Sequence, residues 1–347
     1  YGNPTGNLFS PISSAQGTYP GTFNPLAMAT NAINKEWGDA LNSRFAIDYK
    51  LIPNVLKFSS NLTLNNKNNK NKNFLPQLAT GRPFTETSVN RASDSDLDDY
   101  SMNTKTSLLF TPQLGNNHLF TGNLSFLTTD GRYTIQGLSS TNTASSYLQD
   151  PSIPSRTLTG NALSTTIQSR TIGALFQGNY MFKSRYTLAG SVRMDGNSRF
   201  GPANRYGVFY SMSGAWRIGQ EAFLKDIEEI NDIKIRASWG QSGGAPRTEY
   251  SYINIYNTYE YAYLGENGVG SSNIELANLK WETKNQLNLG LDVELFDHRL
   301  VFAGEIYKNR TNDMLMNGIQ IANYNGFSAL TMNVGTMDND GWEASVN

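Results

Sequence analysis

The sequence predicts an all-β fold, an antiparallel transmembrane β-barrel of which this chain supplies a part. The first observation behind this prediction is the alternation of apolar and polar residues in successive segments, which is clearest between Arg185 and Gly240. One parity there is apolar and comprises Tyr186, Leu188, Val192, Met194, Tyr206, Val208, Tyr210, Met212 and Trp216, whereas Arg193, Ser211, Ser213 and Arg217 fall on the other. A period of two places one face of a strand in an apolar medium and the other in a polar one.

The lengths of the connections are the second observation. Tight turns alternate with connections of roughly 30 to 44 residues, whereas compact domains favour about 4–6. Outer-membrane barrels have this layout, with short periplasmic turns and long extracellular loops. Two connections, 195–204 and 219–231, are nearly equal in length and depart from it, and the second is expected to hold a short helical turn. A soluble β-sandwich would bury apolar faces equally well but would rarely keep so strict an alternation.

About eleven strands are expected from these patterns. They cover residues 43–51, 55–64, 103–112, 118–128, 166–182, 185–194, 205–218, 232–239, 284–296, 299–309 and 339–347. A short helix is expected ahead of them, around Leu26 to Trp37. Asp195-Gly196-Asn197 is expected to form a hairpin turn, because Gly and Asn tolerate positive φ angles. The polar tract NNKNNKNKN at 65–73 and the residues 129–165 are expected to be solvated loops.

Composition excludes several classes of protein. The 347 residues carry 28 Lys and Arg against 29 Asp and Glu, so no polybasic surface points to nucleic acid. The mean hydropathy is −0.45, and no apolar run reaches the roughly 18–20 residues of a membrane helix. Membrane strands need only about 9–11 residues and stay compatible with these values. Cysteine is absent, which removes disulfides, thiolate metal sites and cysteine nucleophiles.

The two ends of the sequence indicate an internal piece of a longer protein. Tyr1-Gly2-Asn3-Pro4 has neither the basic start nor the apolar core of a signal peptide, and the chain stops inside an expected strand. An odd set of strands is not a whole bacterial barrel, because such barrels have even strand numbers and an open edge in lipid leaves backbone groups unpaired. The missing strands are therefore expected outside this sequence.

Several consecutive blocks match a known family in order and spacing from about residue 170 to the end. They include 193–201 (RMDGNSRFG), 213–218 (SGAWRI), 234–240 (KIRASWG), 279–283 (LKWET), 307–315 (YKNRTNDML) and 339–343 (NDGWE). In these blocks the chain resembles the SusC/RagA family of TonB-dependent outer-membrane transporters of Bacteroidetes-type bacteria.

The resemblance implies a 22-stranded barrel of the plugged size class, with residues 1–347 forming part of one barrel domain. It also implies active import of a bulky nutrient, a glycan or an oligopeptide, across the outer membrane of a Gram-negative cell. The implied partners are a SusD-like surface lipoprotein and the TonB–ExbB–ExbD complex, which acts through a plug and a TonB box outside this sequence. The resemblance implies neither a cofactor nor an enzymatic activity. A passive porin or surface adhesion barrel is the first alternative, and a secreted β-rich hydrolase is the second.

The tyrosine-rich stretch within 240–283 is the best candidate for contact with a substrate or partner. Tyrosine offers a flat apolar face with a hydroxyl at its tip, which suits sugar rings and peptides. The candidate residues are Tyr252, Tyr256, Tyr259, Tyr261 and Tyr263. The alternative is that these tyrosines only extend the wall of the barrel above the membrane or pack against a partner.

Two other patterns point to chemistry without the context that chemistry needs. Gly240-Gln241-Ser242-Gly243-Gly244 fits the nucleophile elbow, and Asp292 and His298 follow in hydrolase order, but no helix is expected after the turn. The acidic run Asp94, Asp96, Asp98 and Asp99 could suggest calcium, yet it lacks the glycine and the closing glutamate of an EF-hand loop. A solvated loop is the expected outcome for this run, and no catalytic, metal or cofactor residue is assigned.

Overall fold

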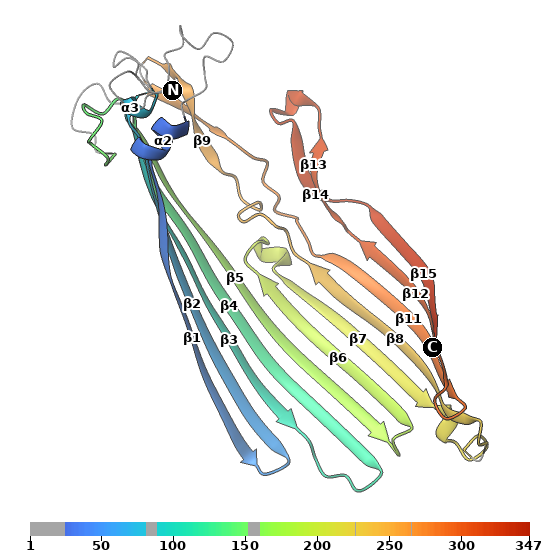
Figure 1. The fold of residues 1–347 in the computed structure, drawn as a ribbon. Helices are drawn as coiled ribbons and strands as arrows, with labels where there is room; N and C mark the ends of the chain where they lie inside the picture. The colour runs from blue at the N-terminus through green and yellow to red at the C-terminus, as the bar shows by residue number, and fades with distance from the viewer. Residues whose placement is uncertain (1–24, 81–88, 152–159, 226, 265) are drawn as a thin grey trace. The chain divides into compact units, whose positions relative to one another are not determined.

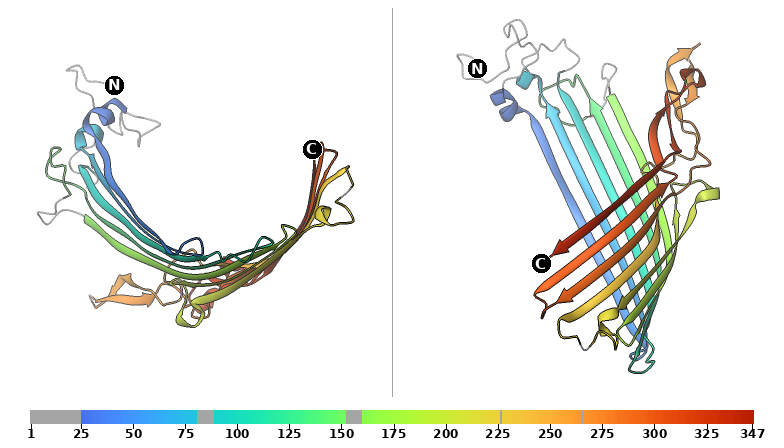
Figure 2. Two further views of the ribbon diagram at one scale, coloured as in Figure 1. Left: turned by 90° about the horizontal axis from the view of Figure 1, so that it is seen from below. Right: turned by 90° about the vertical axis from the view of Figure 1, so that its right-hand side faces the viewer.

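The computed structural model describes residues 25–80, 89–151, 160–225, 227–264 and 266–347. These residues form two compact units, one from the stretches before 44, 63–102 and 131–168, the other from 44–62, 103–130 and 169–347. The main element is an eleven-stranded sheet in which each strand pairs with the next along the chain, in the order β1-β2-β3-β4-β5-β6-β7-β8-β11-β12-β15 (Figures 1 and 2). The all-β prediction and its antiparallel strands are thus confirmed.

The strands of the main sheet have the following bounds: β1 Ile33–Ile52, β2 Leu56–Leu75, β3 Arg91–Phe110, β4 His118–Ser140, β5 Gly160–Phe182, β6 Tyr186–Asn197, β7 Tyr206–Arg217, β8 Ile230–Gly244, β11 Glu282–Leu295, β12 Leu300–Asn312 and β15 Thr336–Val346. Two hairpins stand outside it, formed by β9 Tyr256–Tyr263 with β10 Glu266–Ser271 and by β13 Leu315–Gln320 with β14 Ala329–Asn333. The helical elements are α2 Pro25–Asn31, α3 Gln77–Thr80 and the 3₁₀ turns η1 Pro202–Asn204, η2 Ile218–Gln220 and η3 Asn323–Asn325. Among the described helices, none has the length and apolar character needed to cross a bilayer.

Three expectations about polar segments are wrong. The tract 65–73 lies inside β2, and the acidic run lies inside β3. The expected loop 129–165 begins inside β4, which continues to Ser140. Cross-strand hydrogen bonds explain the difference: Asn68 donates through Nδ2 to Asp96 and to Asp98 at 2.7 Å each, and Lys70 Nζ lies 3.4 Å from Asp96. Polar residues can extend a ladder when the side chains opposite them are complementary.

The helix expected at 26–37 is shorter than predicted. It ends at Asn31, and Trp37 already belongs to β1. The first compact unit has a small core of its own, in which Ala27, Phe74 and Val89 are buried. Asn90 is also fully buried there, and its Nδ2 donates to the Thr143 carbonyl at 3.0 Å.

Three short turns lie in the gaps that the expected strands leave, at 52–54, 183–184 and 297–298, whereas one expected turn is absent. Asn54, Lys183, Ser184, Asp297 and His298 all adopt positive φ angles, as tight turns between antiparallel strands require. The expected turn at Asp195-Gly196-Asn197 is wrong, because all three residues belong to β6 and Gly196 pairs with Tyr206. A Cβ at position 196 would lie 2.7 Å from the side chains of Ile172 and Tyr206, so close packing explains this glycine.

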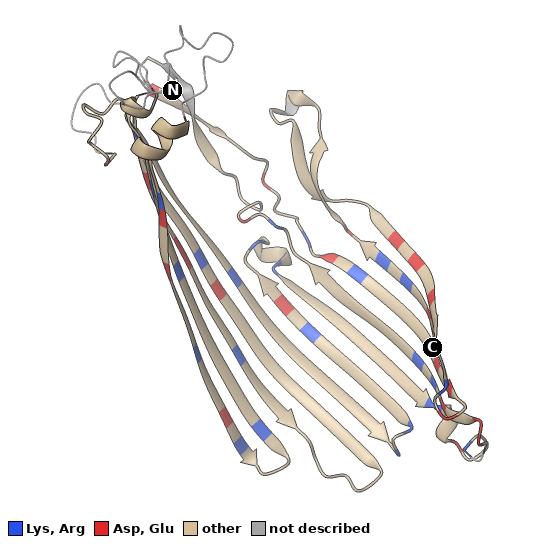
Figure 3. Cartoon of the chain, viewed as in Figure 1, with Lys and Arg blue, Asp and Glu red and all other residues tan. Residues whose placement is uncertain are grey.

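The apolar parity of β6 to β8 forms one continuous face of the sheet, and that face is exposed. Trp216 pairs with Tyr186 and with Ile235, and Met212 pairs with Trp239, so the apolar residues of neighbouring strands lie side by side. Met212 is 58% exposed and Ile235 is 45% exposed. On β7, no charged residue precedes Arg217 (Figure 3). A soluble protein would cover a large apolar surface of this kind, whereas a membrane covers it with lipid.

Candidate functional site: the polar face and the outer connections

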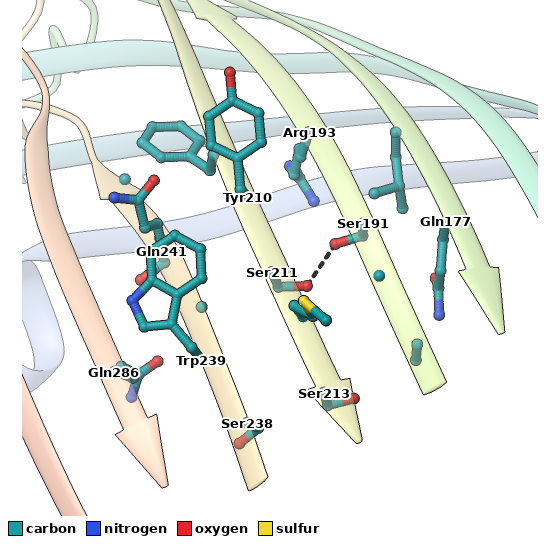
Figure 4. Close-up of a pocket in the computed structure, with 18 of the residues that line it drawn as sticks. Gln177, Ser191, Arg193, Tyr210, Ser211, Ser213, Ser238, Trp239, Gln241 and Gln286 are labelled. Carbon is teal, nitrogen blue, oxygen red and sulfur yellow. Dashed lines mark hydrogen bonds between the residues drawn. The ribbon is translucent and has the colours of Figure 1, made fainter. Parts of the chain in front are cut away.

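The opposite face of β5 to β8 and β11 is polar and holds a hollow of about 710 Å³. Serine hydroxyls from neighbouring strands face one another there, and Ser191 Oγ lies 2.7 Å from Ser211 Oγ (Figure 4). The polar side chains that line the hollow include Gln177, Ser191, Arg193, Ser211, Ser213, Ser238, Ser242, Gln286 and Asn288. Hydroxyls and amides both donate and accept hydrogen bonds, so this wall can contact hydrated or hydroxyl-rich molecules.

A charged network continues the polar face toward the short-turn end of β8, β11 and β12. Arg236 Nη1 lies 2.6 Å from Glu305, and Lys234 Nζ lies 3.2 Å from Asp292. The guanidinium of Arg236 lies over Gly290, where a Cβ would come within 2.4 Å of its Cζ atom. Gly290 therefore leaves the space that this ion pair occupies.

Two amide oxygens of the polar face are buried without a hydrogen-bond partner in the part of the chain that the structure describes. They belong to Asn288, which lines the hollow, and to Asn309 on β12. A buried oxygen of this kind is expected to accept a hydrogen bond from water or from a bound group. We therefore place Asn288 among the residues able to contact a ligand.

An aromatic cluster joins the β6–β7 connection to the start of β11. Phe200 is fully buried, and its ring centroid lies 4.6 Å from that of Trp281. Trp281 donates through Nε1 to the Asn204 carbonyl at 3.1 Å and contacts the edge of Phe209 at 5.6 Å. The RMDGNSRFG and LKWET blocks of the sequence are therefore structural, since they supply the two halves of this cluster.

An ion pair ties the same connection to the segment that precedes β9. Arg199 Nε lies 2.5 Å from Glu249 Oε1, and the Glu249 side chain is largely buried. Tyr252 lies close by, with its Cβ 3.7 Å from where a Cβ at Gly201 would be. The β6–β7 connection thus positions the start of the tyrosine-rich stretch.

The tyrosine prediction falls on a hairpin rather than a loop. Tyr256 begins β9 and is 62% exposed, and Tyr259, Tyr261 and Tyr263 follow on the same strand. Tyr252 precedes the strand and is half-buried. The hairpin pairs Tyr263 with Glu266, and alternation alone does not indicate this pairing.

A second hollow, of about 370 Å³, lies between the segment 248–276 and the β13–β14 hairpin. Its apolar lining comprises Ile255, Ile274, Leu276, Phe327, Ala329 and Leu330. No tyrosine is among the described residues that line it. No local pattern could have indicated this hollow, because its two walls are more than forty residues apart along the chain.

The hydrolase alternative does not fit the geometry. Ser242 pairs with Lys284, and Asp292 pairs with Lys234, on the same two strands. The eight positions between them correspond to about 27 Å at 3.4 Å per residue, so no catalytic triad can form. His298 lies in the turn after β11, where its Nδ1 is 2.7 Å from Glu294.

The acidic run does not form a metal centre. Within the described ranges, no group of three or more His, Asp or Glu side chains is arranged to hold a metal ion. Asp96 and Asp98 are instead hydrogen-bonded to Asn68.

Aromatic rings gather at the short-turn end of β5 to β7. Phe182 stacks near Tyr186 with centroids 6.2 Å apart, and Tyr186 stacks on Trp216 at 6.3 Å. The Glu221 carboxylate accepts hydrogen bonds from the Tyr186 hydroxyl at 2.5 Å, from Trp216 Nε1 at 3.1 Å and from Arg185 at 3.2 Å. Tyrosine and tryptophan are typical of the membrane–water interface.

We expect this carboxylate to make stability depend on pH. The Tyr186 hydroxyl, with Trp216 and Arg185, holds the pKa of Glu221 below its ordinary value of 4.5. A lowered folded pKa contributes stability above the ordinary value, and that contribution is lost as the pH falls through the folded value. Glu221→Gln should therefore flatten the acid limb of a plot of urea midpoint against pH from 7 to 3. The exposed Glu228→Gln variant is the control, and an equal change in both variants would contradict this role.

Comparisons with known proteins agree with this architecture. The family model described as "TonB dependent receptor-like, beta-barrel" matches residues 1–347. TonB-dependent receptor P3 of Formosa agariphila is 30% identical over 97% of this chain and 34% of its own length. TonB-dependent receptor SusC of Bacteroides thetaiotaomicron is 34% identical over 49% of this chain and 17% of its own length.

Among solved structures, the RagAB peptide transporter is similar, with a TM-score of 0.80 at 22% identity. That match covers 92% of this chain and 35% of the other. At 22% identity, it shows similarity of fold alone. The chain spans about a third of the length of curated relatives such as TonB-dependent receptor P3. Together with the two-faced sheet, the match of the family model over the full sequence shows that the chain belongs to the TonB-dependent receptor-like β-barrel family.

Proposed function

We propose that this chain forms part of the barrel wall of an outer-membrane transporter that imports a bulky nutrient, a glycan or an oligopeptide. The carrying observation is a sheet with one exposed apolar face and one polar face that holds a hollow of about 710 Å³. The apolar face fits lipid, and the polar face fits an aqueous lumen. The long connections that bear β9–β10 and β13–β14 then lie on the extracellular side, and the short turns lie in the periplasm.

The partners are proposed from the relatives. A SusC relative and the fold of the RagAB peptide transporter support pairing with a SusD-like lipoprotein over the extracellular connections. Membership in the family supports energy coupling by the TonB–ExbB–ExbD complex. Tyr252, Tyr256, Tyr259, Tyr261 and Tyr263 are proposed to contact the substrate or this lipoprotein. Ser211, Ser213 and Asn288 are proposed to line the path of the substrate.

Filling the hollow should lower uptake without lowering the amount of receptor in the membrane. Ser213→Trp places a large ring on the polar face, in the hollow. Val208→Trp places the same ring on the apolar face of the same strand, at a position that does not line the hollow. In the full-length receptor, we expect Ser213→Trp to reduce uptake of an accepted glycan or peptide by roughly tenfold or more, because the ring occupies the wall that the substrate passes. Uptake per assembled receptor is the measurement, and equal loss in both variants would refute the assignment of the two faces.

The same assay separates the alternatives. An active transporter should lose uptake when TonB is deleted or when the inner-membrane gradient is collapsed. Uptake that persists under both conditions would identify a passive porin instead. Surface attachment of the cells without uptake would identify an adhesion barrel.

A further inference from the structure

The β7–β8 connection, described at residues 218–225 and 227–229, begins at the edge of the apolar face of the sheet. Its Glu221 carboxylate is held by the Tyr186 hydroxyl and by Trp216 Nε1. These two residues pair with each other across β6 and β7 and belong to the exposed apolar parity. The connection therefore starts at the short-turn edge of this face, where Glu221 is tied to its last two aromatic side chains.

Beyond Glu221, the connection exposes large apolar side chains. Phe223 is 67% exposed and Ile227 is 40% exposed. The backbone around them is ordered by hydrogen bonds, since Lys225 N–H donates to the Glu221 carbonyl at 2.8 Å and Ile227 N–H to the Leu224 carbonyl at 3.1 Å. Single exposed apolar residues are common, but these two follow directly on the exposed apolar face of the sheet and extend its apolar surface.

A second short turn fixes the other end of the connection. The Phe296 N–H donates to the Glu229 carbonyl at 2.9 Å, and the His298 N–H donates to Asn231 Oδ1 at 3.2 Å. Phe296 is itself 52% exposed. The β7–β8 and β11–β12 connections thus form one joined rim at the short-turn end.

We propose that residues 218–225 and 227–229 form an interfacial anchor, in which Phe223 and Ile227 insert among the phospholipids of the periplasmic leaflet. The inference rests on the proposed function, because it requires the apolar face of the sheet to lie in a bilayer. Continuity decides the occupant: the anchor begins at the Tyr186–Trp216 stack, which is the end of the lipid-facing surface. Apolar rings at this level, with charged residues beside them, lie in the headgroup region of a membrane.

The charges of the segment are compatible with this position. Glu221 lies nearest the apolar face, and three donors satisfy its carboxylate. Glu228 and Glu229 are exposed and can remain in water. In the proposed position, Phe223 and Ile227 would face lipid, and the exposed charged side chains, Lys225 among them, would face the periplasm.

Site-directed labelling tests the proposal in the full-length receptor in nanodiscs of phosphatidylethanolamine and phosphatidylglycerol. A polarity-sensitive fluorophore is placed at Phe223→Cys and quenched by spin-labelled lipid or by aqueous iodide, with unmodified receptor treated in parallel as background. Leu188→Cys on the apolar face is the lipid control, and Asn116→Cys, in the exposed β3–β4 turn, is the water control. We expect the label at 223 to be quenched at least twofold more by spin-labelled lipid than the label at 116, and correspondingly less by iodide.

Each other result has a distinct meaning. Iodide quenching at 223 equal to that at 116 would overturn the anchor, and so would shielding from both quenchers, since that indicates a protein partner. If the label at 188 is also not quenched by lipid, the proposed function fails. Lipid quenching at 188 without lipid quenching at 223 refutes the anchor alone.

Discussion

Leu291→Arg should destabilise the membrane-embedded barrel by about 2–4 kcal/mol, which is the cost of a cationic side chain on the lipid face near the bilayer midplane. Leu291 lies midway between Leu287 and Leu295 on the apolar parity of β11 and pairs with Ile235 and Gly304. It is 38% exposed, so lipid is its remaining contact. An arginine there must either lose its hydration or bend along the strand to reach water.

The matched control is Gln286→Arg, which places the same side chain on the opposite face of the same strand. Gln286 lines the polar hollow and is exposed, so an arginine there keeps its hydration and we expect assembly close to that of the unmodified receptor. Urea titration of the receptor folded into lipid vesicles measures the difference, and the heat-dependent shift of the folded band on a gel measures assembly. If Gln286→Arg is the more damaging change, the two faces have been assigned the wrong way round.

The two faces could be predicted from the sequence because successive residues of a strand point to opposite faces, so the alternation is visible along the chain itself. Alternation alone places Tyr186 and Trp216 on the apolar parity, and their register sets them opposite each other. The polar tract in β2 was missed for the converse reason. Asn68 is paired by Asp96 and Asp98, which come from another strand, and no local pattern reports a partner about thirty residues away.

The candidate site was predictable only in part. Alternation placed Ser211 and Ser213 on the polar parity, but the hollow exists because five strands bring their small polar side chains together, which depends on register. The role of Phe200 could not be predicted, because it lies in a connection, where no alternation of apolar and polar residues indicates which side chains are buried. The tyrosines were recognised by type, and their contacts stay a prediction.

Phe200→Ala should destabilise the outer end of the barrel by about 3–5 kcal/mol, the range found when a buried aromatic side chain is removed. Phe200 is fully buried against Trp281, and nearby Leu279 is 3% exposed. Removing the Phe200 ring therefore leaves a cavity that water does not reach. The loss should also free the β6–β7 connection and weaken the hold of Arg199 on Glu249. Both effects would be read as a lower urea midpoint and as faster protease cleavage within 245–280.

Tyr324→Ala is the control for this change, since it removes a ring of similar size that is 90% exposed at the β13–β14 hairpin. It should leave both the urea midpoint and the cleavage rate within 245–280 unchanged. Phe200→Leu keeps most of the apolar volume and should recover a large part of the lost stability, because the cost of an apolar replacement follows the volume left empty. If Phe200→Ala leaves the cleavage rate within 245–280 unchanged, the Arg199–Glu249 pair holds the tyrosine-rich stretch without the aromatic cluster. In that case the double variant Phe200→Ala with Glu249→Gln should raise the cleavage rate.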